Sequence, residues 1–391
     1  MVAFAGCSAA PAPVAKRAGA PRTVVLISLD GMRHDYPIRV AAPTFARLAA
    51  EGATADRLIP PYPSQTFPGH ATLATGVTAE RHGIVNNRFK DRVRGAFNYG
   101  EEASWYDAMP LWVYTTRQGL TTYVDQWVGS RGPWQGTEPA EVHHFEKGSD
   151  DDDRLDRLLA WLHRPAPPRL VMSYWLGCDK AGHGEGPDTS EVRDCTEATD
   201  DRLARLSAGL AALPYPTALV VVADHGMTRT EGSVDLYRAV EALDFAVEVI
   251  PSGTVAHLFV APQRIDATLA LVRSLPHLQA WRGDAAPGTP DALPAALHYH
   301  HPTRTGDVVV ATTWGWHFDG RQGRVIPGHH GHDPEKPEMG AVFYAWGDGI
   351  RPGSRAQAPR AVDIMPTLCQ LLGLPIPAGL DGRVLSEILL P

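Results

Sequence analysis

Three short apolar segments rich in β-branched residues constrain the fold of this chain more than any other feature. They span residues 24–29, 170–175 and 218–223. Uninterrupted apolar runs of this length predict central strands that are buried on both faces of a sheet. A fourth run of the same kind covers residues 341–346. The sequence therefore predicts a central, mostly parallel sheet.

Amphipathic stretches separate the apolar runs and predict helices. They lie at residues 43–51, 151–163, 191–213 and 362–373. Strands that alternate with helices indicate an α/β sandwich, with helices flanking the sheet. Residues 233–316 differ, because short strand candidates there surround a helix at 265–275. We expect this segment to form a small inserted α+β cap subdomain within one large domain that covers residues 22–391.

Charge and hydropathy exclude two classes of protein. The chain has 391 residues and a formal net charge of −8, and its Lys and Arg residues form no block. A protein that binds duplex nucleic acid through its phosphates needs such a basic block, so no duplex partner is expected. No apolar run reaches the roughly 18 residues that a membrane span needs. We therefore expect a monomer without a transmembrane span.

The first 21 residues are expected to be a disordered leader or tether, because an Ala- and Pro-rich stretch fills most of them. Phe4-Ala-Gly-Cys7 is similar to the end of a bacterial lipoprotein signal, which makes Cys7 a candidate lipid anchor. The expected location is periplasmic or extracellular. In such a compartment Cys178 and Cys195 either form a disulfide or remain free thiols, and the sequence leaves both open.

Acidic and imidazole side chains follow the predicted strands at the points where the strands end. In open α/β sheets this edge is where ligands bind. Catalytic zinc takes Asp oxygen and His nitrogen ligands, and a pair of zinc ions needs about six of them. The candidate ligands are Asp30, Asp179, His183, Asp224, His225 and His330. His332 is the rival of His330, because residues 328–333 read Gly-His-His-Gly-His-Asp.

The ordered motifs resemble those of the alkaline phosphatase superfamily, and most closely its nucleotide pyrophosphatase/phosphodiesterase branch. The motifs are Asp30-Gly, Thr66-Phe-Pro-Gly-His, Asp179-x-x-x-His183, Asp224-His-Gly-Met and His330-Gly-x-Asp. The resemblance runs from about residue 22 to the end of the chain and implies two Zn²⁺ ions. One would be held by the equivalents of Asp179, His183 and His330. The other would be held by Asp30, Asp224 and His225 and would also contact the hydroxyl of Thr66.

The same resemblance implies that Thr66 is the nucleophile, and metal coordination is a standard way to activate a hydroxyl. Residues 69–75 predict the start of a helix, which would direct backbone N–H groups and a positive dipole end toward the phosphate on Thr66. An N-cap role is the alternative for Thr66. Asn87 matches the family asparagine that donates to a phosphoryl oxygen, with Asn86 as its rival.

Phe67 and Tyr174 match family positions that sandwich the nucleobase, although Tyr174 also fits a core strand. The expected function is hydrolysis of phosphodiester or phosphoanhydride bonds in nucleotides through a phospho-threonine intermediate. The alternatives are a phosphomonoesterase, a hydrolase of choline-type or phosphonate esters, and an inactive binding homologue. The chain departs from the family pattern in two places, with Gly177-Cys178 in place of the usual Glu-Pro and Gly69 in place of Asn.

Overall fold

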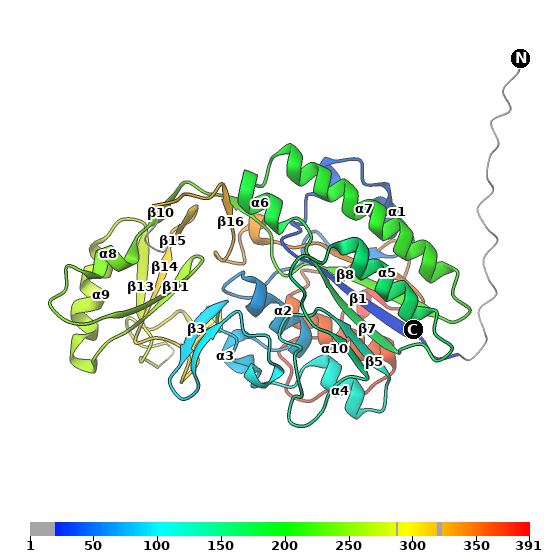
Figure 1. Cartoon of the computed structure of the whole chain (residues 1–391), viewed down its shortest axis with the longest axis horizontal. Helices are drawn as coiled ribbons and strands as arrows, with labels where there is room; N and C mark the ends of the chain where they lie inside the picture. The colour runs from blue at the N-terminus through cyan, green and yellow to red at the C-terminus, as the bar shows by residue number, and fades with distance from the viewer. Residues whose placement is uncertain (1–19, 287, 319–322) are drawn as a thin grey trace, which may run out of the picture.

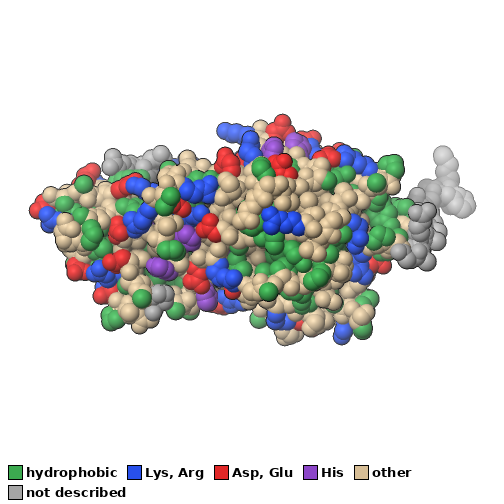
Figure 2. Space-filling view, turned by 90° about the horizontal axis from the view of Figure 1, so that it is seen from below, with side chains coloured by type: hydrophobic (Ala, Val, Ile, Leu, Met, Phe, Trp, Pro, Cys, Tyr) green, Lys and Arg blue, Asp and Glu red, His purple; other side chains and the backbone are tan. Residues whose placement is uncertain are grey.

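The computed structural model describes residues 20–286, 288–318 and 323–391. Most of the predicted leader, including the candidate anchor Cys7, lies outside these residues. Among the helices that are described, none combines the length and the apolar character that crossing a membrane requires. On the face drawn in Figure 2, Lys and Arg side chains lie interspersed with Asp and Glu rather than gathered in one basic area.

The core of the structure is an eight-stranded sheet with the order β18-β2-β17-β8-β1-β7-β5-β6. Its strands are β1 Thr23–Leu29, β2 Ala53–Thr54, β5 Thr122–Asp125, β6 Glu141–His143, β7 Leu170–Trp175, β8 Thr217–Val222, β17 Phe343–Gly347 and β18 Ser354–Arg355. The five strands from β8 to β6 run parallel, and β17 is antiparallel to β8. The predicted α/β architecture with a mostly parallel sheet is confirmed.

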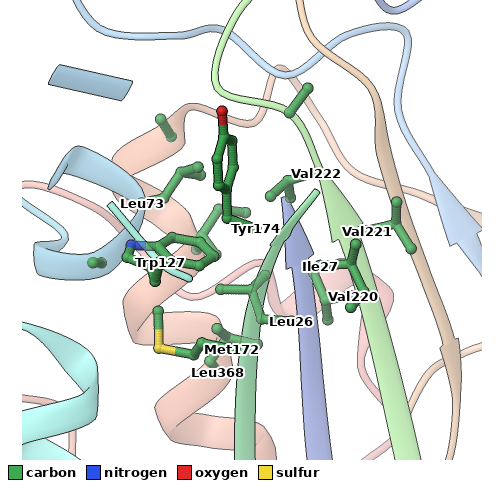
Figure 3. Close-up of a cluster of buried hydrophobic side chains, with 14 of the residues drawn as sticks. Leu26, Ile27, Leu73, Trp127, Met172, Tyr174, Val220, Val221, Val222 and Leu368 are labelled. Atoms are coloured by element: carbon green, nitrogen blue, oxygen red, sulfur yellow. The ribbon is translucent and has the colours of Figure 1, made fainter. Parts of the chain in front are cut away.

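The middle strands are buried along their whole length, as the apolar runs predict. Every residue of β1, β7 and β8 is buried. Leu26, Met172 and Val220 belong to one cluster together with Leu368 of α10 (Figure 3). Because the strands carry apolar side chains on both faces, the sheet is stable only where helices cover both sides.

Helices form one layer on each face of the sheet (Figure 1). One layer holds α1 Pro43–Glu51, α5 Asp151–Leu162 and α7 Ser190–Ala211, which contact one another and the strands β17, β7 and β8. The other layer holds α2 Thr66–Thr75, α4 Leu111–Arg117 and α10 Ile364–Leu372, with the short α3 Ala79–His82 beside α2. The last of the predicted helices is slightly shorter than expected, because residues 361–363 form a 3-10 turn before α10 begins.

A second, antiparallel sheet lies at the other end of the molecule (Figure 1) and has the order β11-β12-β14-β13. Its strands are β11 Glu248–Ser252, β12 Val255–Phe259, β13 Leu278–Arg282 and β14 Val308–Thr312. Helices α8 Leu236–Val240 and α9 Ile265–Ser274 pack on it and share a separate hydrophobic cluster with it. Three small pairs complete the list: β3 Arg88–Asp91 with β4 Gly95–Asn98, β9 Thr228–Arg229 with β16 Gly328–His329, and β10 Gly232–Val234 with β15 Trp316–Phe318.

Candidate metal centre and active site

The register of the central strands brings three aspartates to one edge of the sheet. Leu29 pairs with Trp175 at the end of β7, and Ser28 pairs with Val222 at the end of β8. Asp30 and Asp224 therefore follow neighbouring strand ends. Helix α6 Asp179–Glu185 begins beside them, because the backbone N–H groups of residues 178 and 179 both donate to the carbonyl oxygen of Asp30, at 3.0 and 3.1 Å.

A glycine allows this close approach. Gly31 adopts φ +64°, and a Cβ there would lie 2.8 Å from the Cα of Asp179. Its N–H donates to Oδ1 of Asp224 at 3.2 Å. A side chain at position 31 would therefore push α6 away from the strand ends, and with it the predicted ligand Asp179.

The six predicted ligands fall into two clusters of three. One cluster contains Asp179, His183 and His330, and the other contains Asp30, Asp224 and His225; within each, one ligand atom per residue lies within 4.8 Å of the others. Helix α6 carries the first two ligands of the first cluster one turn apart. The clusters adjoin, since the rings of His225 and His330 stack with centroids 3.6 Å apart.

Backbone carbonyl groups fix the orientation of all three histidines. Nδ1 of His183 donates to the carbonyl of Gly328 at 2.8 Å, and Nδ1 of His330 donates to that of Ser64 at 2.8 Å. His225 makes the same bond to Gly226 at 2.9 Å. A carbonyl can only accept, so each neutral ring carries its proton on Nδ1 and leaves Nε2 with a free lone pair. Such bonds are the usual support of metal-binding histidines.

Three buried carboxylate oxygens show whether these residues are suited to bind metal ions. Oδ1 of Asp30, Oδ1 of Asp179 and Oδ2 of Asp224 have no hydrogen-bond donor. Burial raises the pKa of Asp30 and Asp224 well above the usual range, with a further contribution from neighbouring aspartates, and burial raises the pKa of Asp179 to about 7. Three clustered carboxylates that each keep a buried oxygen without a donor are costly unless cations bind them. The donor set therefore fits two divalent ions with oxygen and nitrogen ligands.

Thr66 stands at the first position of α2 beside the second cluster, with its Oγ1 3.4 Å from Nε2 of His225. The helix begins at Thr66, so the predicted start within residues 69–75 is wrong by three residues. Gln65 is the N-cap residue and Thr66 is not. Gly69 allows α2 to approach the strand end, since a Cβ there would lie 2.8 Å from Cβ of Asp224.

Beyond Thr66, the backbone N–H groups at the start of α2 are not free to bind an anion. The N–H of Phe67 donates to Oδ1 of Asn87 at 2.8 Å, Pro68 has no N–H, and the N–H of Gly69 donates to the carbonyl of Gln65 at 2.8 Å. The helix start therefore offers fewer free donors to an anion than the sequence suggested. An anion bound here would therefore rely on the N–H of Thr66, on side-chain donors and on bound cations.

The two candidate asparagines face different ways. Asn87 lines the pocket beside Thr66 and its side-chain oxygen accepts from the helix start. Asn86 instead donates through Nδ2 to the carbonyl groups of Ser252 and Val255 in the second sheet. Of the two, only Asn87 lines the pocket, whose wall also includes Asp30, Asp179, His183 and His330.

The rival histidines of residues 328–333 separate in the same way. His330 joins the first cluster, where its Nε2 lies 3.1 Å from Nε2 of His183. His332 packs against Trp314 with ring centroids 5.1 Å apart and belongs to neither cluster. His329 lines the pocket beside His183.

A pocket of about 490 Å³ opens from the two clusters and is lined by aromatic rings. The rings are Phe67, Tyr99, Trp127, Phe145 and Tyr174. Tyr174 is 7% exposed and donates its hydroxyl to Oδ2 of Asp30 at 2.5 Å. Figure 3 shows this hydroxyl pointing away from the buried aliphatic side chains around the ring. Phe145, which also lines the pocket, is 41% exposed and is therefore much less covered than Tyr174.

An ion pair lies on the pocket wall. Nη2 and Nε of Arg131 donate to Oε2 of Glu101 at 2.5 and 3.1 Å. The sequence motifs pointed to neither residue and gave no signal for Phe145, because all three lie in connecting segments outside the named helices and strands. Gln65 was also missed, although it directly precedes Thr66.

A disulfide joins Cys178 to Cys195. It connects the N-cap of α6 to α7, so the helix that carries Asp179 and His183 is covalently held to its neighbour. Of the two states left open by the sequence, the structure contains the disulfide.

The fold and the paired Asp/His clusters define a class of protein, the metal-dependent hydrolases with an alkaline-phosphatase-like sheet. A family model described as type I phosphodiesterase / nucleotide pyrophosphatase matches residues 24–333. The chain belongs to this family, whose members are hydrolases of phosphoester and phosphoanhydride bonds.

Individual relatives agree with this assignment. Human ectonucleotide pyrophosphatase/phosphodiesterase family member 5 is 27% identical over 363 residues, covering 90% of this chain and 74% of the relative. Mouse bis(5'-adenosyl)-triphosphatase enpp4 is 26% identical over 367 residues, covering 91% and 78%. The solved structure of murine family member 5, as an inactive threonine-to-alanine variant in complex with AMP, superimposes with a TM-score of 0.84 at 26% identity, covering 91% of this chain and 96% of that one.

Proposed function

We propose that this chain is a two-zinc phosphodiesterase that cleaves phosphodiester or phosphoanhydride bonds of nucleotides through a phospho-threonine intermediate on Thr66. The observation that carries the proposal is the position of the Thr66 hydroxyl, 3.4 Å from Nε2 of His225 and beside two Asp/His clusters in which one oxygen of each aspartate has no donor. Zinc ions, when bound there, would lower the pKa of the hydroxyl and neutralise phosphate charge.

The residues around Thr66 have separate tasks in this reaction. Asp179, His183 and His330 would hold one ion, and Asp30, Asp224 and His225 the other. Thr66 attacks phosphorus and is esterified, and the bond to the leaving group breaks. Water then releases the product from Thr66. A threonine-to-alanine change also gives the inactive form of murine family member 5.

Asn87 supplies the side-chain donor for a phosphoryl oxygen. Its Oδ1 accepts from the helix start, so its Nδ2 is the donor end, and one Nδ2 hydrogen remains beside the bond to Oε1 of Gln65. Beyond Thr66, the N–H groups at the start of α2 are bonded within the protein or absent at Pro68, so this amide carries a larger share of the contact with phosphate than a helix N-terminus alone would suggest.

The aromatic pocket favours a nucleobase as the group next to phosphate. Phe67 lines it directly after the nucleophile, and Phe145 offers the most exposed second ring among Phe67, Phe145 and Tyr174. Bases stack on such rings whatever their sequence. The AMP bound to murine family member 5 supports the same substrate class. Glu101 is neutralised by Arg131, which argues against a pocket selective for the cationic choline group.

The disulfide and the family of ecto-enzymes support a periplasmic or extracellular site of action. We also propose that the second sheet with α8 and α9, within residues 233–316, acts as the cap of the catalytic domain. The cap reaches the pocket through Gly253, which follows β11.

The decisive experiment compares a bis-aryl phosphodiester with the matching aryl monoester at defined zinc concentration. We expect the diester and a dinucleoside polyphosphate to be cleaved much faster than the monoester. Chelation should abolish both activities and zinc should restore them. A monoester rate far above the diester rate would assign the chain to the phosphomonoesterases instead.

A further inference from the structure

Gln65, which precedes the nucleophile, contacts the asparagine proposed to bind phosphate. Its side chain is 2% exposed, and its Oε1 accepts a hydrogen bond from Nδ2 of Asn87 at 3.1 Å. The other end of the same Asn87 amide accepts from the N–H of Phe67 at 2.8 Å. An N–H can only donate, so this bond fixes which end of the amide is oxygen. Gln65 then holds one of the two Nδ2 hydrogens and leaves the second for a ligand.

Two glycines leave room for the Gln65 carboxamide. A Cβ at Gly253 would lie 2.0 Å from its Nε2, and a Cβ at Gly331 would lie 2.3 Å from the same atom. Gly253 belongs to the β11–β12 hairpin of the second sheet, and Gly331 directly follows the predicted ligand His330. Gln65 is therefore wedged between the hairpin and the metal-binding loop, and its carboxamide has little freedom to rotate.

The neighbouring Asn86 ties the same hairpin to the backbone of Asn87. Its Nδ2 donates to the carbonyls of Ser252 and Val255, at 3.3 and 3.4 Å, on either side of the hairpin turn. Its Oδ1 accepts from the backbone N–H of Asn87 at 2.8 Å. The β11–β12 hairpin thus reaches Asn87 along two routes, through Gln65 and through Asn86.

We propose that Gln65 is a positioning residue that aims the Asn87 amide at the phosphoryl group, with the β11–β12 hairpin as its support. This inference rests on the proposed donor role of Asn87. It assigns the second sheet a part in the chemical step, because the sheet supplies the glycine turn against which Gln65 is held. Gln65 itself makes no contact with the reacting atoms in this scheme.

The test uses Gln65→Met, which keeps the length of the side chain and removes the acceptor. With the full chain, defined zinc and a bis-aryl phosphodiester, we expect kcat to fall about tenfold, the value of one lost hydrogen bond of about 1.4 kcal/mol. KM, zinc content and melting temperature should change little. Gln65→Glu keeps an acceptor for Nδ2 of Asn87, so its kcat should stay close to that of the unmodified chain and well above that of Gln65→Met.

A double-mutant cycle separates positioning from a general structural effect. In the Asn87→Ala background, Gln65→Met should cause no further loss, because the residue it positions is gone. Additive losses, or a fall in zinc content with Gln65→Met, would overturn the inference.

The single variant Asn87→Ala distinguishes this inference from the proposal on which it rests. If Asn87→Ala keeps full activity, the proposed role of Asn87 fails. If Asn87→Ala loses activity and Gln65→Met does not, only the positioning role of Gln65 is wrong.

Discussion

The hydroxyl of Tyr174 donates a hydrogen bond to Oδ2 of Asp30 at 2.5 Å. This bond links the C-terminal end of β7 to the residue that follows β1. Burial, followed by the charge of Asp30, raises the pKa of Tyr174 well above its usual range, so the hydroxyl remains a donor at any working pH. Oδ1 of Asp30 keeps no donor and is left for a cation. Tyr174 therefore supports a candidate ligand, and its ring is mostly covered.

Tyr174 and Phe145 are the two candidates for the ring that stacks on the nucleobase opposite Phe67. The bond to Asp30 predicts that substitutions at these two residues have different effects. Tyr174→Phe removes the bond to Asp30 and should weaken zinc binding about tenfold, with little change in KM for a nucleotide substrate. Phe145→Ala removes an exposed ring and should raise KM for the nucleotide about 5- to 30-fold, equivalent to about 1–2 kcal/mol of lost stacking, while zinc binding is retained. Steady-state kinetics and zinc titration measure both.

An alkyl-aryl phosphodiester that lacks a nucleobase is the matched control for the pocket. Its KM should be nearly unaffected by Phe145→Ala. If Tyr174→Leu, which removes the ring, raises the nucleotide KM as strongly as Phe145→Ala does while Tyr174→Phe leaves it unchanged, Tyr174 is a stacking residue as the sequence predicts.

The nucleophile assignment predicts that Thr66→Ala abolishes turnover without loss of zinc. The hydroxyl is the attacking group, whereas the proposed ligands come from six other side chains. Thr66→Ser keeps a hydroxyl at the same helix position and should retain partial activity. The measurement is kcat on a bis-aryl diester together with the metal content of each variant. A fully active Thr66→Ala enzyme would refute the assignment.

The parts of the site that could be predicted are those that follow a regular strand. Asp30 and Asp224 stand directly after apolar runs, so the parallel register alone places them together. Asp179 and His183 are four residues apart, so a single helical turn is enough to place both side chains on one face of α6. For these residues, local sequence fixes both the element and the direction of the side chain.

The parts that could not be predicted depend on contacts between distant connecting segments. Phe145 follows the edge strand β6, and the partners Glu101 and Arg131 lie in two different loops. Nothing in the periodicity of such segments shows which side chains face a pocket. The hydrogen bond from Tyr174 to Asp30 was missed for a related reason. The role of Tyr174 was predicted from its aromatic ring alone, and the sequence does not show which group its hydroxyl reaches.

The disulfide predicts that reduction weakens the first metal cluster more than the second. Cys178 is the N-cap residue of α6, and the bond to Cys195 holds this helix on α7. Removing a disulfide that closes a loop of this size costs about 3 kcal/mol of stability. In the double variant Cys178→Ser, Cys195→Ser, we expect zinc to be lost first from Asp179, His183 and His330.

Zinc titration by calorimetry would resolve two binding steps, of which one should weaken and the other remain. Cys369→Ser is the matched control, because this cysteine is buried, is not in a disulfide and lies on α10, on the opposite face of the sheet from α7. Equal weakening of both steps would mean that the disulfide stabilises the fold as a whole and has no specific effect on α6.

Buried histidine outside the metal clusters predicts acid sensitivity of the fold. His82 is fully buried; its Nδ1 accepts from the N–H of Ile84 at 3.1 Å, and its Nε2 lies 3.0 Å from Oγ1 of Thr72. Both ring nitrogens are thus occupied in the neutral form. Burial, followed by repulsion from Arg304, lowers the pKa of His82 to about 3.

In the unfolded chain a histidine has a pKa of about 6.5, so below that pH the unfolded state binds a proton that the folded state does not. The free energy of unfolding should therefore fall by about 1.4 kcal/mol per pH unit for this residue as the pH drops from about 6.5 toward 4. His82→Gln should remove this contribution, which denaturant titrations of the chelator-treated protein between pH 6.5 and 4.5 would show as a shallower slope. His163→Gln, at an exposed position, is the control. An unchanged slope in His82→Gln would mean that His82 becomes protonated in the folded protein despite its burial.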